Sequence, residues 1–177
     1  EKEHCAVKEF LAASSQVIGI CGKSGSGKTT FLKILLKELE NFTGECLVNG
    51  TDIREITGEE LWERILYLSQ EPVLLPLSVK ENIALTDSER SDIEKVRRSL
   101  KLADLESLVH TYEEKENHII NKSNLSSGEI QKLCFARCFY TDKDVIILDE
   151  ATSAMSPNAE QKVLHNLIEE VRSKKKI

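Results

Sequence analysis

The sequence has 177 residues, of which 40% are hydrophobic and 31% charged, proportions typical of one globular domain rather than a disordered chain. Its formal net charge is −6, so no overall positive field favours nucleic acid, and no nucleic-acid partner is expected. No apolar run approaches the roughly 20 residues that a helix needs to cross a bilayer. The five cysteines lack the paired spacing of zinc ligands, which favours a reducing compartment, and Cys134 and Cys138 are expected to be small buried residues.

Apolar runs and turn residues predict alternating strands and helices in the first part of the chain. The run 16–21 is rich in β-branched residues and predicts a buried strand that leads into a glycine-rich loop. Leucines at helical spacing then predict a helix over 29–39. Residues 44–50 predict a short strand that ends in an Asn49-Gly50 turn, and 64–68 form another apolar run.

From about residue 79 the pattern becomes helical and charged, with an apolar stripe that predicts a packed helical region. A helix is expected after Ser127, followed by an apolar strand over 144–150 that ends in two carboxylates. Ser156 as N-cap and Pro157 at the first position predict the start of a last helix. Strands that alternate with helices at both ends of the chain predict an α/β fold with a mainly parallel sheet.

A glycine-rich loop at residues 22–29, here called the phosphate loop, matches G-x-x-x-x-G-K-[ST] between a predicted strand and a predicted helix. Its glycines allow backbone N–H groups to converge on an anion, and the helix that follows adds its N-terminal dipole. Lys28 is expected to reach the β- and γ-phosphates, and the Thr29 hydroxyl to join the Mg²⁺ shell. The residues predicted to hold ATP here are Gly22, Ser24, Gly25, Ser26, Gly27, Lys28, Thr29 and Thr30.

Asp149 and Glu150 form the second part of the predicted ATP site, at the end of an apolar strand. A nucleoside triphosphate site needs a carboxylate to hold its metal, and Asp149 is suited to that position. Glu150 is suited to act as base or orienting group for the attacking water. Without the phosphate loop, the same pair would be interpreted as a helix cap or as solvated charges.

Three elements in this order resemble the ATP-binding cassette (ABC) ATPases: the phosphate loop, Gln70 after an apolar strand, and the signature segment Leu125-Ser126-Ser127-Gly128-Glu129. The resemblance covers nearly the whole chain, and residues 77–84 are similar to exporter-type nucleotide-binding domains. It implies a single P-loop NTPase (RecA-like) domain with a mainly parallel sheet and a small antiparallel β region. Residues 1–72 and 140–177 would form the nucleotide-binding core, and 73–139 an inserted α-helical subdomain that carries the signature segment.

The resemblance also implies a role for each motif residue. Glu150, Gln70 and Lys28 would be catalytic, and Thr29, Gln70 and Asp149 would contact Mg²⁺. ATP held by one subunit would also be contacted by the other: the signature segment would bind its γ-phosphate through Ser126, Ser127 and Gly128. Two chains would then pack head to tail around two ATP molecules, as a homo- or heterodimer. Further partners would be the transmembrane domains of a transporter, at the cytoplasmic face of a membrane.

Some family features are changed or not found in this sequence. The usual signature Leu-Ser-Gly-Gly-Gln has Ser127 and Glu129 here, and Ser156 stands where the D-loop usually has aspartate. No convincing adenine-stacking aromatic or switch histidine is found, which implies a domain truncated at both ends and weakly active or inactive in isolation. The leading hypothesis is ATP hydrolysis that powers a membrane transporter. Alternatives are a non-hydrolysing ATP-binding regulatory module or a soluble, non-transport ABC ATPase.

Overall fold

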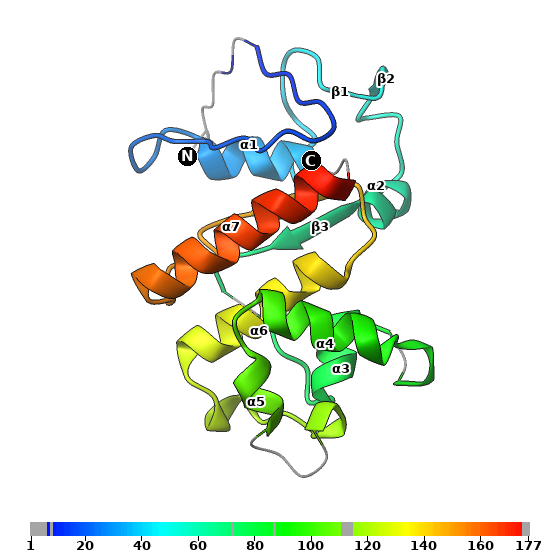
Figure 1. Ribbon diagram of the computed structural model, residues 1–177. Helices are drawn as coiled ribbons and strands as arrows, with labels where there is room; N and C mark the ends of the chain where they lie inside the picture. The colour runs from blue at the N-terminus through cyan, green and yellow to red at the C-terminus, as the bar shows by residue number, and fades with distance from the viewer. Residues whose placement is uncertain (1–6, 8, 72, 87, 111–114, 175–177) are drawn as a thin grey trace.

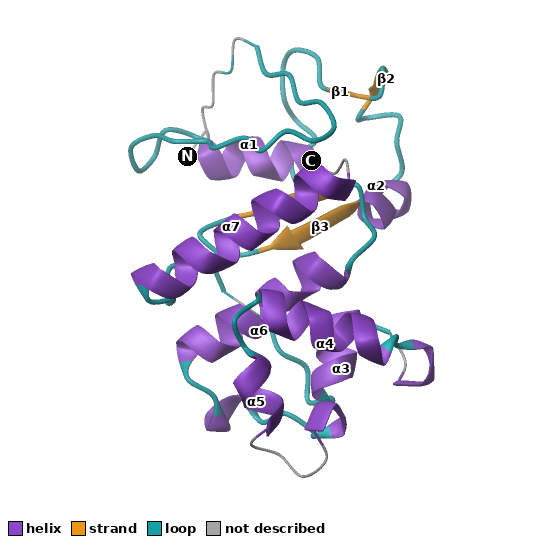
Figure 2. Ribbon diagram, in the orientation of Figure 1, coloured by secondary structure: helices purple, strands orange, loops and turns teal. Residues whose placement is uncertain are grey.

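The structure is a computed structural model that describes residues 7, 9–71, 73–86, 88–110 and 115–174 (Figure 1). Parts of the predicted segments 1–72, 73–139 and 140–177 therefore lie outside the described residues. Helices predominate, and the strands are short (Figure 2). The elements in chain order are α1 (Lys28–Leu35), β1 (Leu47–Val48), β2 (Thr51–Asp52), α2 (Gly58–Arg64), β3 (Ile65–Leu68), α3 (Val79–Ala84), η1 (Ser88–Arg90), α4 (Ile93–Leu102), α5 (Glu106–His110), η2 (Lys115–Asn117), η3 (Lys122–Asn124), α6 (Ser127–Tyr140), β4 (Val145–Leu148) and α7 (Pro157–Lys174).

The apolar runs 64–68 and 144–150 both contain strands, and these strands lie side by side. β3 and β4 pair in parallel, with Leu68 opposite Leu148 at their carboxyl ends. β1 and β2 form a separate antiparallel hairpin. Its turn residues Asn49 and Gly50 have φ values of 51° and 83°, the left-handed conformation that a two-residue hairpin turn requires. The predicted Asn-Gly turn and the small antiparallel region are therefore present.

The larger hydrophobic core packs helices against one face of the β3–β4 pair. Leu66 and Leu68 point to this face from β3, in the period-2 alternation of a strand. α6 supplies the largest fully buried side chains, Phe135 and Phe139. In Figure 1, α7 crosses in front of β3, and α3, α4, α5 and α6 gather below it. The predicted amphipathic faces of α4 and α7 are buried here, through Val96, Leu100, Val163, Leu167 and Val171.

A smaller core covers the opposite face of the same strand pair. It is formed by Leu36, Ile53, Leu61 and Ile65. Tyr67 and the β4 residues facing the same way are partly buried against it. The strands that carry the predicted carboxylates are thus fixed from both faces, although they are only four residues long.

The segment between β3 and α3 is held by a fully buried amide. The Asn82 side chain is 0% exposed; it donates to the carbonyl oxygens of Leu75 and Leu77 and accepts from the Leu75 N–H. The guanidinium group of Arg137 donates to the carbonyl oxygens of Val73 and Asn82, both at 2.8 Å. The role of Arg137 is therefore structural, through these two backbone contacts. Residues 73–77 are therefore held in place without regular secondary structure.

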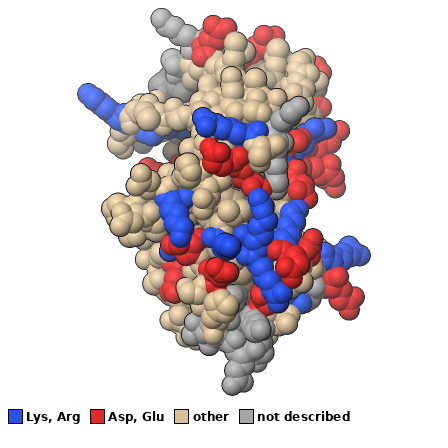
Figure 3. Space-filling model, in the orientation of Figure 1, with Lys and Arg blue, Asp and Glu red and all other residues tan. Residues whose placement is uncertain are grey.

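Ion pairs join the helices below the sheet to α7. Arg98 of α4 makes two hydrogen bonds to the carboxylate of Glu170, at 3.0 and 2.6 Å. Asp104, which follows α4, accepts from Lys132 of α6 at 2.8 Å and from Lys162 of α7. These two lysines, Lys132 first, lower the pKa of the Asp104 carboxyl. Figure 3 shows basic and acidic side chains interspersed over this face.

The strand predicted over 16–21 is wrong. These residues form no strand, and Val17, Ile18 and Ile20 are exposed by 55, 39 and 43%. A turn precedes them, in which the Gln16 N–H donates to the Ala13 carbonyl. That turn places 15–19 beside 9–11, where both segments line a surface hollow with Arg172. An apolar run becomes a strand only when another strand pairs with it, and among the described residues the parallel sheet contains only β3 and β4.

The first helix also ends earlier than predicted, at Leu35 rather than Leu39. At the helix end, the Leu36 N–H donates to the Leu32 carbonyl at 2.8 Å and the Lys37 N–H donates to the Ile34 carbonyl at 3.0 Å. Lys37 then adopts φ 59°, a left-handed conformation that turns the chain away from the helix axis. Its ammonium group donates to the carbonyl oxygens of Arg54 and Ile56, which stabilises the turn.

Candidate functional site

The phosphate loop curls around the side chain of Lys28. Gly25 and Gly27 have φ values of 76° and 90°, and Gly27 is the N-cap of α1. The Lys28 ammonium group donates to the carbonyl oxygens of Gly22 at 2.9 Å and Lys23 at 3.2 Å. A Cβ added to Gly22 would lie 2.6 Å from the hydroxyl of Ser26, so the curl is close enough to favour glycine there. The loop therefore combines a positive charge with the N-terminus of a helix, as an anion site requires.

The predicted phosphate contacts are accessible. Ser24, Gly25, Ser26 and Thr29 are exposed, and Lys28 is partly buried. No side chain therefore needs to leave a core before a nucleotide approaches this loop.

Gln70 and Glu150 lie together at the carboxyl ends of β3 and β4. The Gln70 amide nitrogen donates to a carboxylate oxygen of Glu150 at 3.0 Å. Just before it, the Asp149 N–H donates to the Leu68 carbonyl at 2.9 Å and so extends the parallel ladder. Two residues separated by 80 positions thus meet, because parallel strands end at the same edge of a sheet.

Tyr67 contacts the second carboxylate of this edge. Its hydroxyl donates to Asp149 at 3.3 Å. Burial and the neighbouring Asp149 charge raise the pKa of the Tyr67 hydroxyl, which therefore stays a neutral donor at neutral pH. Tyr67 was not among the residues predicted from the sequence, because its approach to Asp149 depends on the pairing of β3 with β4.

Glu150 adopts a backbone conformation that is uncommon for a residue with a side chain. Its φ is 50°, in the left-handed region. The Ser153 N–H donates to the Glu150 carbonyl at 3.2 Å, which closes a tight turn behind the carboxylate. On the other side, the Thr152 hydroxyl donates to Glu160 of α7 at 2.6 Å. Such strain persists where the surroundings over-determine the backbone, and it clusters at functional sites.

The signature segment opens α6 with a capping box. Ser126 is the N-cap, and the Glu129 N–H donates to its hydroxyl oxygen at 3.3 Å. In return, the Glu129 carboxylate accepts from the backbone N–H of Ser126 at 2.8 Å and from its hydroxyl at 2.6 Å. These hydrogen bonds lower the pKa of the Glu129 carboxyl. The hydroxyl predicted to contact a phosphate is therefore held by Glu129 in this structure.

The capping box makes the stability of α6 depend on pH. The Glu129 pKa is lower in the folded chain than its ordinary value of 4.5. Its contribution is therefore fully present above that ordinary pKa and is lost as pH falls through the lower, folded pKa. At pH 7 the Glu129→Gln variant is expected to be less stable by about 0.5 kcal/mol, because glutamine still caps but loses the charge–dipole attraction. Urea unfolding should show this difference shrinking as the pH is lowered below 4.5.

A matched control for this pH effect is Glu40→Gln, which removes a carboxylate from an exposed position. Its unfolding free energy should stay close to that of the parent at pH 7 and at pH 3. If Glu129→Gln keeps the same difference at pH 7 and at pH 3, the charged capping box does not contribute as described.

The predicted site residues fall into separate groups in this structure. In the described part of the chain, no hydrogen bond or ion pair links residues 22–29 to Gln70, Asp149 or Glu150. The predicted Mg²⁺ ligands nevertheless offer a hydroxyl, an amide oxygen and a carboxylate, a set of hard oxygen donors that suits Mg²⁺. Among the described residues, no group of three or more His, Cys, Asp or Glu side chains is suited to hold a metal ion by itself.

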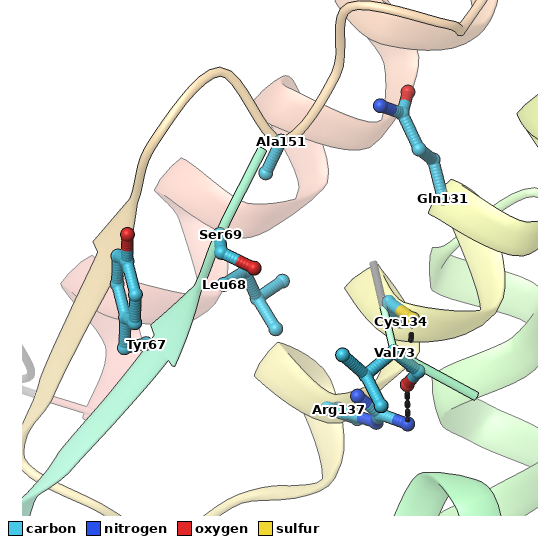
Figure 4. Close-up of a pocket in the computed structure, with 8 residues that line it drawn as sticks. All are labelled: Tyr67, Leu68, Ser69, Val73, Gln131, Cys134, Arg137 and Ala151. Carbon is cyan, nitrogen blue, oxygen red and sulfur yellow. Dashed lines mark hydrogen bonds between the residues drawn. The ribbon is translucent and has the colours of Figure 1, made fainter. Parts of the chain in front are cut away.

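A small cavity of about 100 Å³ lies between the end of β3, α6 and the turn after Glu150 (Figure 4). Cys134 lines it, and burial raises the pKa of its thiol, as fits the small buried cysteine expected from the sequence. Gln131 extends from α6 toward the chain near Ala151 in the same view. The sequence analysis missed Gln131, and no spacing signal identifies it. The lining residues are Tyr67, Leu68, Ser69, Val73, Gln131, Cys134, Arg137 and Ala151.

Comparison with known proteins places these motifs in a family. The family model described as ABC transporter matches residues 9–153. The chain is 34% identical over 156 residues to the "Beta-(1-->2)glucan export ATP-binding/permease protein NdvA" of Rhizobium johnstonii, covering 87% of this chain and 26% of that protein. It is 33% identical over 156 residues to the "ATP-dependent lipid A-core flippase" of Methylococcus capsulatus, with the same two coverages.

A solved structure of a bacterial Atm1-family ABC exporter with ATP bound also matches, with a TM-score of 0.76 and 25% sequence identity. The match covers 85% of this chain and 27% of that chain. The chain thus spans about a quarter of the length of the relatives it matches. In the described ranges, no helix combines the length and apolar character needed to cross a bilayer. Because the family model matches most of the chain and includes all its motifs, the chain belongs to the ABC transporter family, as its ATPase domain.

Proposed function

We propose that this domain binds ATP with Mg²⁺ and hydrolyses the ATP to power a membrane transporter. The observation that carries the proposal is the 3.0 Å contact between Gln70 and Glu150. It supports a catalytic carboxylate fixed at the strand ends, where ligands of parallel α/β sheets bind. Names of the relatives, which describe export proteins and a flippase, support the link to transport.

The proposed reaction is attack of water on the γ-phosphorus of ATP. A new P–O bond forms, the bond to ADP breaks, and the Glu150 carboxylate takes the proton of the water. Lys28 and the N–H groups of the phosphate loop bind the phosphates, and Gln70 orients Glu150. Thr29, Gln70 and Asp149 would hold Mg²⁺, which supplies positive charge to the phosphates when bound. Positioning and charge stabilisation account for most of the rate in such reactions.

A second copy, or a related domain, is proposed to complete each site. Ser126 and Ser127 are exposed at the N-terminus of α6, which offers an anion-binding end to the γ-phosphate of a partner. Glu129 must release the Ser126 hydroxyl before that hydroxyl donates to phosphate. Head-to-tail packing would bring each signature segment to the phosphate loop of the other copy.

The transmembrane partner is proposed to contact the segment after Gln70. Val73 and Ile119 are exposed by 62 and 66%, and Leu77 by 38%. Leu77 and Ile119 are held near one another, because Ser78 pairs with Ile119 and the Ile120 N–H donates to the Leu77 carbonyl. Exposed apolar patches of this kind mark interaction surfaces. This arrangement would place the domain at the cytoplasmic face of the membrane.

One observation favours a second function, a non-hydrolysing module that binds ATP and regulates a partner. The Glu129 carboxylate occupies the N-terminus of α6, where a partner's γ-phosphate is proposed to bind. Negative charge there opposes closure of the dimer.

Phosphate release and ATP binding, measured on the protein expressed from its complete gene, separate the two functions. Saturable, Mg²⁺-dependent release of phosphate supports the ATPase. Tight ATP binding without phosphate release would overturn hydrolysis and support the module.

A further inference from the structure

Gln131 joins α6, the helix that the signature segment opens, to the turn that follows Glu150. Its side chain lies one turn into α6 and is only 4% exposed. The amide nitrogen donates to the hydroxyl of Ser153 at 3.1 Å. The amide oxygen accepts from the backbone N–H of Ala154 at 2.7 Å. One side chain thus satisfies two groups of the same turn with both ends of its amide.

The same turn determines the backbone of Glu150. The Ser153 N–H donates to the Glu150 carbonyl, and Glu150 has the left-handed φ of 50°. A left-handed glutamate relaxes unless its neighbours hold it. Ser153 is therefore the connection between Gln131 and the carboxylate that contacts Gln70.

A second contact joins the two segments at the start of α6. A Cβ added to Gly128 would lie 3.2 Å from the Ala154 carbonyl oxygen, so the helix backbone and the turn pack closely. Gly128 belongs to the signature segment, whereas Ala154 belongs to the turn. The helix end that would receive a partner's phosphate and the turn behind Glu150 are thus in contact at two points.

We infer that Gln131 is a positioning residue: it couples the position of α6 to the position of Glu150 through Ser153. The inference rests on the proposed ATPase function, and it assigns a link between the two half-sites carried by one chain. Movement of α6 toward a partner's phosphate would pull the turn at Ser153 and Ala154, and thereby set the angle of the Glu150 carboxylate. Gln131 contacts neither substrate nor reacting atoms in this scheme.

The inference is tested by Gln131→Ala in the protein expressed from its complete gene. The kcat for ATP hydrolysis is expected to fall about tenfold, because a small misplacement of a catalytic group is costly. KM for ATP should stay within about twofold, since the phosphate loop is untouched. Amide exchange of residues 150–156 should become about tenfold faster, because the Ala154 N–H loses its acceptor. Unchanged kcat would overturn the inference, even if exchange becomes faster.

Two further variants separate positioning from folding. Ser153 is exposed, so Ser153→Ala should fold normally and lower kcat in the same direction. The double variant should lose less than the product of the two single losses, because both remove one connection. Cys134→Ala is the matched control: Cys134 lies on the same helix and lines the same cavity, but its thiol donates to the Val73 carbonyl rather than to the turn.

Normal kcat and normal exchange for Cys134→Ala support the inference, whereas a loss equal to that of Gln131→Ala would show a general packing effect and overturn it. Failure of the proposed function gives a different result: the unsubstituted protein releases no phosphate.

Discussion

Replacing Lys28 with alanine is expected to lower kcat/KM for ATP about a thousandfold. At about 4 Å, one charge pair at a protein surface contributes about 4 kcal/mol, which corresponds to that factor. Lys28 supplies this charge from within the curl of the phosphate loop, where it donates to the carbonyl oxygens of Gly22 and Lys23. Alanine removes the charge and also leaves those carbonyls without their donor. Nucleotide titration and phosphate release measure the loss directly.

Lys23→Ala is the matched control, because it removes a lysine from the same loop but not the ammonium group held within the curl. It should bind and hydrolyse ATP within about threefold of the parent, as expected for an exposed charge. Lys28→Arg should restore little activity, since a planar guanidinium does not fit a loop built around a compact ammonium group. ATP affinity within tenfold of the parent in Lys28→Ala would contradict the assignment of the phosphate site.

Replacing Glu150 with glutamine is expected to abolish turnover while leaving ATP binding intact. Glutamine keeps the shape of the side chain and an oxygen that accepts from the Gln70 amide. It cannot accept the proton of the attacking water, and loss of a general base lowers kcat by about a hundredfold to ten-thousandfold. Since ATP binds but is not cleaved, the proposed dimer should accumulate. Single-turnover phosphate release and size-exclusion chromatography with ATP measure these two consequences.

Glu71→Gln controls for the removal of a nearby negative charge, because Glu71 is an exposed carboxylate next to Gln70 in the chain and takes no part in the Gln70–Glu150 hydrogen bond. Its kcat should match that of the parent. Phosphate release from Glu150→Gln at the parental rate would remove Glu150 as the base and leave the Gln70–Glu150 contact with a structural role only.

Local sequence signals predicted those parts of the fold whose interactions are close in sequence. The Asn49-Gly50 turn and the Ser156-Pro157 helix start are each determined by neighbouring residues. The strand predicted over 16–21 is absent for the opposite reason, because strand formation depends on a pairing partner that the local pattern does not contain. Lys37 likewise ends α1 through contacts with carbonyls 17 and 19 residues away.

The residues of the candidate site also differ in whether the local sequence identifies them. The phosphate loop is a local motif, so its curl and its helix N-terminus follow from spacing. Gln70 and Glu150 meet only because β3 and β4 are neighbours, which required the resemblance to a known family to anticipate. Gln131 remained hidden, since its partners lie 22 and 23 residues away and an interior glutamine carries no motif of its own. The left-handed backbone of Glu150 was equally hidden, because that conformation is imposed by the folded surroundings.

The ion pairs of Asp104 make one part of the domain sensitive to dissolved salt. The Asp104 carboxylate accepts from lysines on two different helices, while Arg98 and Glu170 join a further pair of helices beside it. Attractions between partly exposed charges weaken as dissolved salt screens them, whereas the apolar cores do not weaken in this way. Ionic strength therefore acts selectively on the joint between α7 and the helices below the sheet. A cell that accumulates potassium would loosen this joint while the sheet and its carboxylates stay in place.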